Sequence, residues 1–241
     1  MFANLQIDDV LFLDIETVPL APSLEKLDET MQKLWDKKSR NFRLPDQTAA
    51  DVYERAGIYS EFGKIICISV GFIKTKDPFS IRLKSFYNDD EKLLLKDFSA
   101  MLQKFSSSKR EAVLCAHNGK EFDFPYIARR MIINSLQIPG LLDNAGKKPW
   151  EVRHLDTMDL WKFGDHKNFT SLELLATVLG IESPKDDIDG SMVASVYWAN
   201  NDLDRIVRYC ERDVITIARI LLRLMNLPGI ADDSIESVTQ I

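Results

Sequence analysis

Residues 10–16 read Val-Leu-Phe-Leu-Asp-Ile-Glu, and this stretch decides the fold. Apolar residues fill both alternating sets of positions, which is typical of a central strand that is covered on both faces. Side chains two residues apart in a strand point to the same face, so Asp14 and Glu16 share the face of Val10 and Phe12. Neighbouring carboxylates repel each other and resist burial. They therefore either lie in solvent where the strand ends or belong to a site.

The pattern around this strand predicts an α/β fold with a mixed β-sheet flanked by helices. Further strands are expected at residues 64–73, 81–87 and 112–116. The first two should pair antiparallel, because no helix separates them. Helices are expected at residues 91–105, 124–134, 171–180 and 202–225, and residues 154–163 should be part strand and part helix. This order is compatible with the ribonuclease H-like fold, although the pattern alone does not single that fold out.

The chain of 241 residues fits one domain, which we place at residues 1–227. Residues 19–63 interrupt the strand pattern and predict a helical insertion, with a charged helix at about 24–38 and a shorter helical stretch at about 49–56. A C-terminal tail follows at residues 228–241. About the last dozen residues lose the apolar pattern, so we expect disorder there.

Composition bounds the class of protein. Hydrophobic residues make up 45% of the chain, and no apolar run is long enough to cross a membrane, so a protein without membrane contact is expected. The three cysteines lie far apart in apolar segments, which indicates buried thiols in a reducing, cytoplasmic compartment. The formal net charge of −6 is unusual for a tight nucleic-acid binder. Two divalent cations at four site carboxylates would change it to −6 + 4 = −2.

A third acidic candidate follows the strand expected at residues 112–116. Asp123 ends the segment Asn-Gly-Lys-Glu-Phe-Asp at residues 118–123, directly before an expected helix. One interpretation is a helix N-cap, because an aspartate at that place accepts hydrogen bonds from first-turn amides. The other is a site carboxylate, because functional residues in α/β folds gather beyond the carboxyl ends of the strands.

The last helix carries the fourth carboxylate. Tyr209 and Asp213 are four residues apart and therefore share a helix face. At roughly 100° per residue, Ile206, Ile217 and Ile220 all fall within about 40° of Asp213, so Asp213 lies in the apolar stripe of the helix. A carboxylate there needs a metal, a proton or a polar partner. A boundary aspartate bonded to an arginine would also satisfy the pattern.

These carboxylates suit one class of metal. Oxygen ligands without paired histidine or cysteine are typical of Mg²⁺ or Mn²⁺ sites. The three histidines, His117, His154 and His166, lack zinc-ligand spacing, and the chain has no glycine-rich phosphate loop. The sequence therefore predicts a hard divalent cation held by Asp14, Glu16, Asp123 and Asp213.

Three segments, taken in order, resemble the motifs of the DEDD exonucleases in their tyrosine-bearing branch. They are Leu-Asp-Ile-Glu-Thr at 13–17, Asn-x-x-x-Phe-Asp at 118–123 and Tyr-x-x-x-Asp at 209–213. Three others look like the predicted stand-alone 3′–5′ exonucleases related to the proofreading domain of family B DNA polymerases, namely residues 61–65, 183–190 and 209–214. The resemblance extends from about Leu11 to Leu227 without departing at the five motif positions, and it includes no polymerase domain.

The resemblance implies a metal-dependent 3′–5′ exonuclease with a ribonuclease H-like fold. Its substrate would be a single-stranded DNA 3′ end, from which two-metal-ion hydrolysis releases nucleoside monophosphates. Asp14, Glu16 and Asp213 would hold one Mg²⁺ or Mn²⁺ ion, and Asp14 with Asp123 the other. Tyr209 would orient the attacking water, because a phenol is a poor base at neutral pH.

The same motifs imply three substrate contacts, at Thr17, Asn118 and Phe122. Thr17 is a candidate to hold the terminal 3′ hydroxyl, while Phe122 packs either against the terminal nucleotide or in the core. The loop at residues 183–190 is either a solvated acidic turn or a segment from which Lys185 reaches a phosphate or a site carboxylate.

Other functions remain compatible with the sequence. The same chemistry could trim RNA, because no residue in the sequence indicates whether a ribose 2′ hydroxyl is accepted or excluded. A catalytically inactive nucleic-acid-binding module and a phosphodiesterase acting on small molecules are further alternatives.

Overall fold

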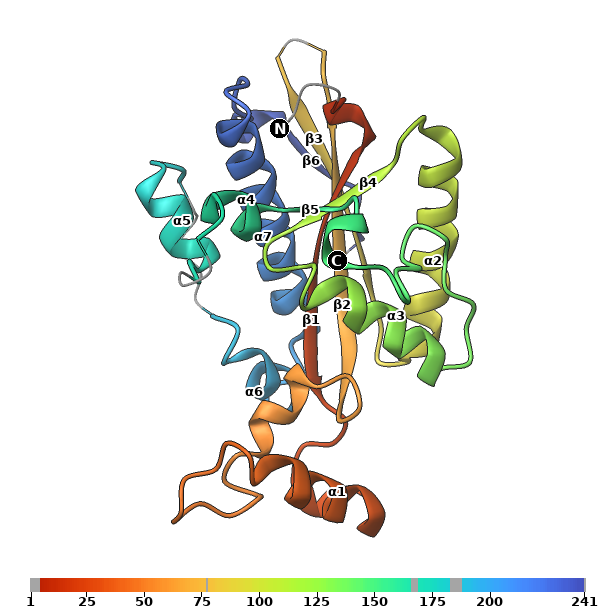
Figure 1. Ribbon diagram of the computed structural model, residues 1–241, viewed down its shortest axis with the longest axis vertical. Helices are drawn as coiled ribbons and strands as arrows, with labels where there is room; N and C mark the ends of the chain where they lie inside the picture. The colour runs from red at the N-terminus through yellow and green to blue at the C-terminus, as the bar shows by residue number, and fades with distance from the viewer. Residues whose placement is uncertain (1–4, 77, 166–168, 183–187, 241) are drawn as a thin grey trace.

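The computed structural model describes residues 5–76, 78–165, 169–182 and 188–240. These residues form a six-stranded sheet in the order β5-β4-β1-β2-β3-β6, with helices on both faces (Figure 1). The strands are β1 (Val10–Pro19), β2 (Gly63–Lys74), β3 (Ser80–Tyr87), β4 (Val113–Ala116), β5 (Leu155–Asp156) and β6 (Ile235–Ser237). The helices are α1 (Glu29–Ser39), α2 (Glu91–Ser108), α3 (Asp123–Ile133), α4 (Thr157–Lys162), α5 (Leu172–Val178), α6 (Val193–Trp198) and α7 (Leu203–Leu224).

The sheet is mixed. The consecutive strands β1, β2 and β3 pair antiparallel, as the missing helices between them predicted. The pairs β1–β4, β4–β5 and β3–β6 are parallel. None of the helices in the described parts of the chain combines the length and apolar composition that a membrane crossing requires.

Strand β1 divides the core between its two faces. Leu11, Leu13 and Ile15 pack in the cluster that α2 and α3 cover. Val10 and Phe12 pack in a second cluster with residues of α7 on the opposite face. The predicted period-2 assignment of this strand is therefore confirmed. It follows that Asp14 and Glu16, which share the face of Phe12, point towards α7.

The segment between β1 and β2, residues 20–62, carries α1 and extends from one end of the sheet; we call it the insertion, after the helical insertion that the sequence predicted at about 19–63 (Figure 1). Helix α1 starts at Glu29 rather than near residue 24, because the side chain of Asp28 caps it by accepting the amide of Met31. A 3₁₀ helix, η3 (Tyr53–Ile58), replaces the short helix expected at 49–56. The insertion has its own aromatic core, made of Trp35, Phe42, Tyr53, Tyr59 and Phe62.

Three polar contacts fasten the insertion to the sheet. The carbonyl of Gly57 in η3 accepts hydrogen bonds from Thr17 Oγ1 at 2.9 Å and from Tyr126 Oη at 2.8 Å. The carbonyl of Ser60 accepts one from Arg130 at 2.8 Å. Gly63 permits this approach, because a Cβ atom there would lie 2.3 Å from Tyr126 Oη and 2.8 Å from the Gly57 carbonyl oxygen.

The C-terminal segment is ordered where the sequence predicted disorder. Residues 232–234 form a 3₁₀ turn, and β6 pairs with the outer strand β3 through Ile81–Ile235 and Leu83–Ser237. The buried carboxylate of Glu211 on α7 accepts hydrogen bonds from Ser85, Ser237 and Thr239 and so holds this segment. A three-residue strand held by hydroxyl groups shows no hydrophobic period, which is why the pattern missed it.

Candidate active site

The two acidic residues of β1 lie inside the strand, not at its end. Strand β1 continues to Pro19, and Glu16 is only 8% exposed, so the interpretation of a solvent-exposed strand end is wrong. Pairing with β4 stops at Phe12–Cys115, whereas pairing with β2 continues along the strand. The edge of β1 beyond Phe12 is therefore unpaired on the side of β4. This gap lets a residue from another element reach the strand beside Asp14.

Asp123 approaches this unpaired edge. After β4 the chain turns at Asn118, which has a positive φ of 63°, and α3 then begins at Asp123. Phe122 occupies the N-cap position, so the N-cap interpretation of Asp123 is wrong. The Asp123 carboxyl group is 3% exposed, and the Ile15 backbone N–H donates a hydrogen bond to it. The strand edge and the start of α3 thus place this carboxylate beside β1.

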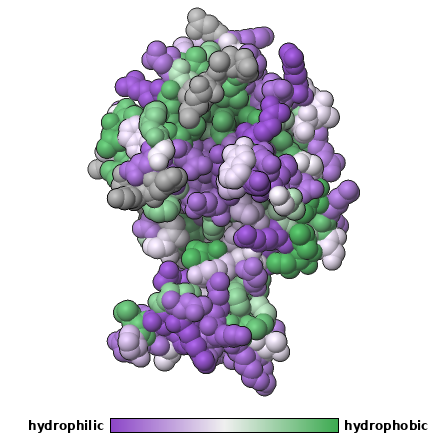
Figure 2. Space-filling view, in the orientation of Figure 1, coloured by the Kyte–Doolittle hydropathy of each residue, from purple (hydrophilic) through white to green (hydrophobic). Residues whose placement is uncertain are grey.

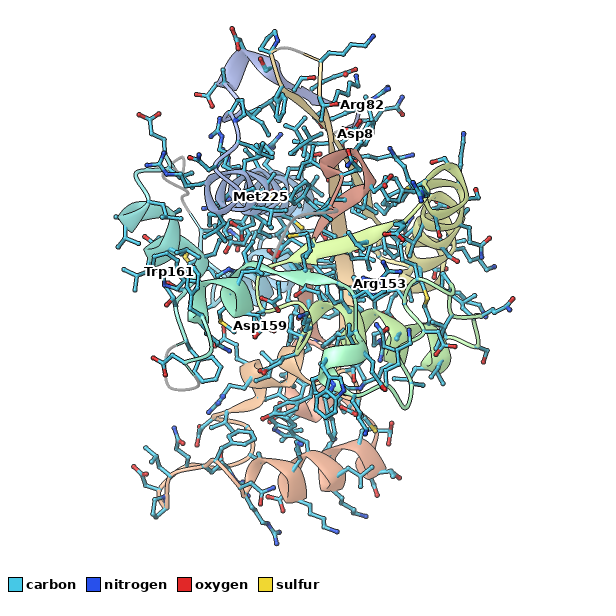
Figure 3. All side chains as sticks on the ribbon, turned by 45° about the horizontal axis from the view of Figure 1, so that its top comes forward. Asp8, Arg82, Arg153, Asp159, Trp161 and Met225 are labelled. Atoms are coloured by element: carbon cyan, nitrogen blue, oxygen red, sulfur yellow. The ribbon has the colours of Figure 1, made fainter. Side chains whose placement is uncertain are left out.

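Helix α7 supplies the remaining residues from the opposite side. Val214, Ile217 and Ala218 pack on the Phe12 face, which lays the helix across Asp14 and Glu16. The phenol of Tyr209 donates a hydrogen bond to Asp213 one turn later. The thiol of Cys210 lies 3.4 Å from Asp14 Oδ2. The C-terminal end of the helix is marked by its C-cap residue Met225, which is labelled in Figure 3.

The electrostatics show that the four carboxylates lie close together. Burial, followed by repulsion from Asp213, Glu16 and Asp123, raises the pKa of Asp14 well above its usual value. Burial and repulsion from Asp213 do the same to the pKa of Glu16. Burial is also the main cause that raises the pKa of Asp123 to about 8 and that of Asp213 to about 6. In the metal-free protein, the ionised form of each of these carboxyl groups is therefore disfavoured.

This donor set fits a hard divalent cation. Within the described chain, no lysine or arginine forms an ion pair with the four carboxylates, and Glu16 accepts no hydrogen bond. Ligand atoms of Asp14, Glu16 and Cys210 all lie within 4.8 Å of one another, close enough to share one ion. None of the ion pairs among the described residues joins an arginine to Asp213, whereas bound divalent cations would neutralise the carboxylates.

The three residues that were predicted to contact the substrate differ in the partners of their side chains. The Thr17 hydroxyl is already bonded to the Gly57 carbonyl, so its side chain fixes η3. Phe122 packs against Tyr126, with ring centroids 5.3 Å apart, at the margin of the core. Asn118 differs, because its side-chain oxygen is buried and has no hydrogen-bond partner among the residues that the structure describes. Lys185 and most of its loop lie outside the described residues.

Two neighbouring side chains were not found from the sequence. Asp156 accepts the backbone amides of Asn118 and Lys120, at 2.9 and 3.1 Å, and caps α4, the helix that carries the labelled Asp159 in Figure 3. It therefore shapes the loop that leads to Asp123. Its place between a short strand and a helix start was the available signal. Cys210 gave no signal, because it read as a core residue of α7.

Comparisons with known proteins agree with this arrangement. A family model described as a predicted 3′–5′ exonuclease related to the exonuclease domain of PolB matches residues 58–239. The match includes Asp123, Tyr209 and Asp213 but not Asp14 or Glu16. No curated protein sequence matches the chain.

A solved structure shares the fold. It is the family B DNA polymerase from the hyperthermophilic archaeon Pyrobaculum calidifontis, with a TM-score of 0.52 and 16% sequence identity. The alignment covers 88% of this chain and 24% of the polymerase, so the chain spans about a quarter of that protein's length. At this identity the likeness establishes the fold, a ribonuclease H-like mixed sheet flanked by helices.

Proposed function

The chain belongs to the family of predicted 3′–5′ exonucleases related to the exonuclease domain of PolB, and from this premise we propose that it removes nucleoside monophosphates from the 3′ ends of single-stranded DNA. The observation that carries the proposal is the meeting of four carboxylates from β1, α3 and α7 without a neutralising cation. Such a cluster is unfavourable unless divalent cations occupy it. The buried thiols further support a reducing, cytoplasmic location.

The roles of the ligands are those that the resemblance to the DEDD exonucleases implies. Asp14, Glu16 and Asp213, the last of which raises the pKa values of the other two by its charge, would hold one Mg²⁺ or Mn²⁺ ion. Asp14 and Asp123, on either side of the unpaired strand edge, would hold the second. When bound, the two metal ions would activate the attacking water and stabilise the leaving oxygen of the phosphodiester. The protein would keep the water and the leaving oxygen in line by fixing its four carboxylates on packed elements.

Tyr209 acts as a neutral orienting group. Burial, followed by the nearby carboxylates, raises its pKa far above the usual phenol value, so it keeps its proton at any physiological pH. It cannot then serve as a general base. Its hydroxyl instead positions the water beside Asp213. The side-chain oxygen of Asn118, buried without a partner among the described residues, supports a substrate contact there.

The proposal is tested by a time course on single-stranded DNA labelled at either end, with Mg²⁺, with Mn²⁺ and with a chelator. We expect stepwise shortening from the 3′ end with either metal, no reaction with chelator, and slower digestion of duplex ends because they must fray first. Preferential release of the 5′-terminal nucleotide, or cutting of circular DNA, would contradict the polarity.

Matched substrates separate the alternatives in the same assay. Faster digestion of an RNA oligomer of the same sequence would reassign the substrate to RNA. Hydrolysis of a simple nucleotide ester without digestion of oligomers would indicate a small-molecule phosphodiesterase. Binding of oligomers without release of any mononucleotide would indicate an inactive binding module.

Replacing Tyr209 with phenylalanine tests the orienting role. The substitution removes only the hydroxyl, so turnover should fall on the order of 10- to 1000-fold, as is typical of a positioned group. The affinity for Mn²⁺, measured by calorimetry, should stay close to that of the wild type. Full activity of Tyr209→Phe would show that the phenol does not take part.

A further inference from the structure

We propose that the insertion, residues 20–62, binds the single strand upstream of the nucleotide being removed. Its contact surface would be the basic stack, which we define as Lys37, Lys38, Phe42, Arg55 and Tyr59. The inference rests on the proposed exonuclease function and adds where the substrate is held. Most of the insertion precedes residue 58, where the family match begins.

Positive charge within the insertion gathers at the end of α1 and just after it, although residues 20–62 as a whole contain seven basic and eight acidic residues, a net charge of −1. Residues 33–43 contain five basic residues and one acidic residue, a net charge of +4, whereas the whole chain carries −6. Arg40 and Arg43 are paired with Asp36. Lys37 and Lys38 are exposed and form no ion pair with any described residue. These two cations are therefore available to a polyanion.

Aromatic rings lie directly beneath cations in the same place. Phe42 and Tyr59 stack with centroids 6.0 Å apart and planes at 16°. The Arg55 guanidinium lies 4.5 Å from the Phe42 ring, and Lys38 Nζ lies 4.5 Å from the Tyr59 ring. The two rings belong to the aromatic core of the insertion and carry Lys38 and Arg55 over them, so the surface offers these cations at fixed places for contacts with phosphates. Figure 2 shows the insertion as a lobe below the main body whose visible face is mostly hydrophilic.

The basic stack is connected rigidly to the active site. Arg55 lies in η3, two residues before Gly57, and the Gly57 carbonyl is bonded to both Thr17 and Tyr126. Thr17 is three residues beyond Asp14 on the same strand, a distance of about 10 Å at the usual strand rise. The segment that carries Arg55 is therefore fastened to the strand of Asp14 and Glu16.

The active site itself cannot supply the affinity for single-stranded DNA. Its four carboxylates repel phosphates until cations neutralise them, and the net charge of the protein opposes binding of DNA. A separate positive surface removes this difficulty, because phosphate contacts provide most of the affinity of sequence-independent binding.

The test is the triple variant Lys37→Gln/Lys38→Gln/Arg55→Gln. These side chains are exposed, so the fold should persist, which circular dichroism will verify. Binding of a fluorescent oligothymidylate in chelator should weaken roughly tenfold or more, and the slope of log K against log salt should fall by about 2 if three single-strand phosphate contacts are lost. The preference of the enzyme for this oligomer over a dinucleotide, as a ratio of kcat/KM values, should shrink.

A control variant removes the same charge elsewhere. Lys92, Lys96 and Lys104 are exposed on α2, and their replacement with glutamine should leave the affinity and the salt slope unchanged. Wild-type affinity in the insertion variant, or equal losses in both variants, would overturn the inference. If the wild type released no nucleotides while only the insertion variant lost binding, the exonuclease proposal would fail and the binding surface would stand.

Discussion

Replacing Asp14 with asparagine should remove nearly all nuclease activity, by roughly a thousandfold or more, because the residue is assigned to both metal ions. The same change should leave the metal-free protein as stable as the wild type, or more stable. A structural aspartate would behave in the opposite way. Asp14→Asn therefore separates a metal ligand from a residue that holds the fold together.

The stability effect has a predictable pH dependence. The carboxyl groups of the site have raised pKa values in the folded protein, to about 8 for Asp123 and about 6 for Asp213 against an ordinary 3.8. The folded state then holds more protons than the unfolded state, so the metal-free wild type loses stability as pH rises from about 4 to 8. Removing the Asp14 charge lessens this loss of stability. The stability of metal-free Asp14→Asn relative to the wild type should therefore increase between pH 5 and pH 8.

Thermal denaturation with and without Mn²⁺ measures both effects. Mn²⁺ at about 100 times its Kd should stabilise the wild type by about 2.7 kcal/mol, which raises its melting temperature by several degrees. Asp14→Asn should show a much smaller rise, and monovalent salt of equal ionic strength should give none. Asp97→Asn, a change at an exposed carboxylate of α2, is the control. A sharply lower metal-free melting temperature for Asp14→Asn would show that the proposed site is misplaced.

The variant Arg130→Met should be severely destabilised. Arg130 and Glu91 form a buried ion pair, with side chains 6% and 7% exposed. Without Arg130 the Glu91 carboxylate stays buried without its cation, which costs about 3 to 5 kcal/mol. For a protein of this size that corresponds to a melting temperature lower by roughly 6 to 20 °C. The exposed neighbour Arg129 provides the control, because Arg129→Met should melt close to the wild type.

A second variant separates the lost charge pairing from the lost contact with the insertion. Glu91→Leu/Arg130→Met removes both charges and should recover a large part of the stability. It still leaves the Ser60 carbonyl without the Arg130 hydrogen bond and the Ile65 amide without Glu91. Equal melting temperatures for Arg130→Met and Arg129→Met would show that the buried pair contributes nothing to stability.

The sequence predicted the elements that have a long hydrophobic period. The strands at 63–74 and 80–87 and the final helix were placed within a few residues, and the face shared by Asp14 and Phe12 was assigned correctly. Residues 154–163, expected as part strand and part helix, form β5 and α4. Strand β6 was missed, because its three residues cannot display a period. The start of α1 was missed by several residues because Asp28 was not recognised as its cap.

The candidate site was only partly accessible to sequence reasoning. Asp14 and Glu16 were recognised but placed at a strand end, because the sequence does not show that β4 pairs with only the first residues of β1. The role of Asp156 depends on the amides of Asn118 and Lys120, about forty residues away in the chain. Contacts of this kind are a property of the folded chain and leave no local pattern.

The positions of the three free cysteines offer a chemical reporter of motion in the protein. Cys67 and Cys210 interact directly beneath Asp14 and Glu16, while Cys115 lies on β4, and all three are buried. An alkylating reagent reaches such thiols only when the structure opens locally. Labelling of the first two thiols records opening of the α7 contact beside Asp14 and Glu16, and labelling of Cys115, which packs against α7 in the neighbouring cluster, records opening farther along the same helix. Local opening of the candidate site can thus be followed by mass spectrometry without substrate or turnover.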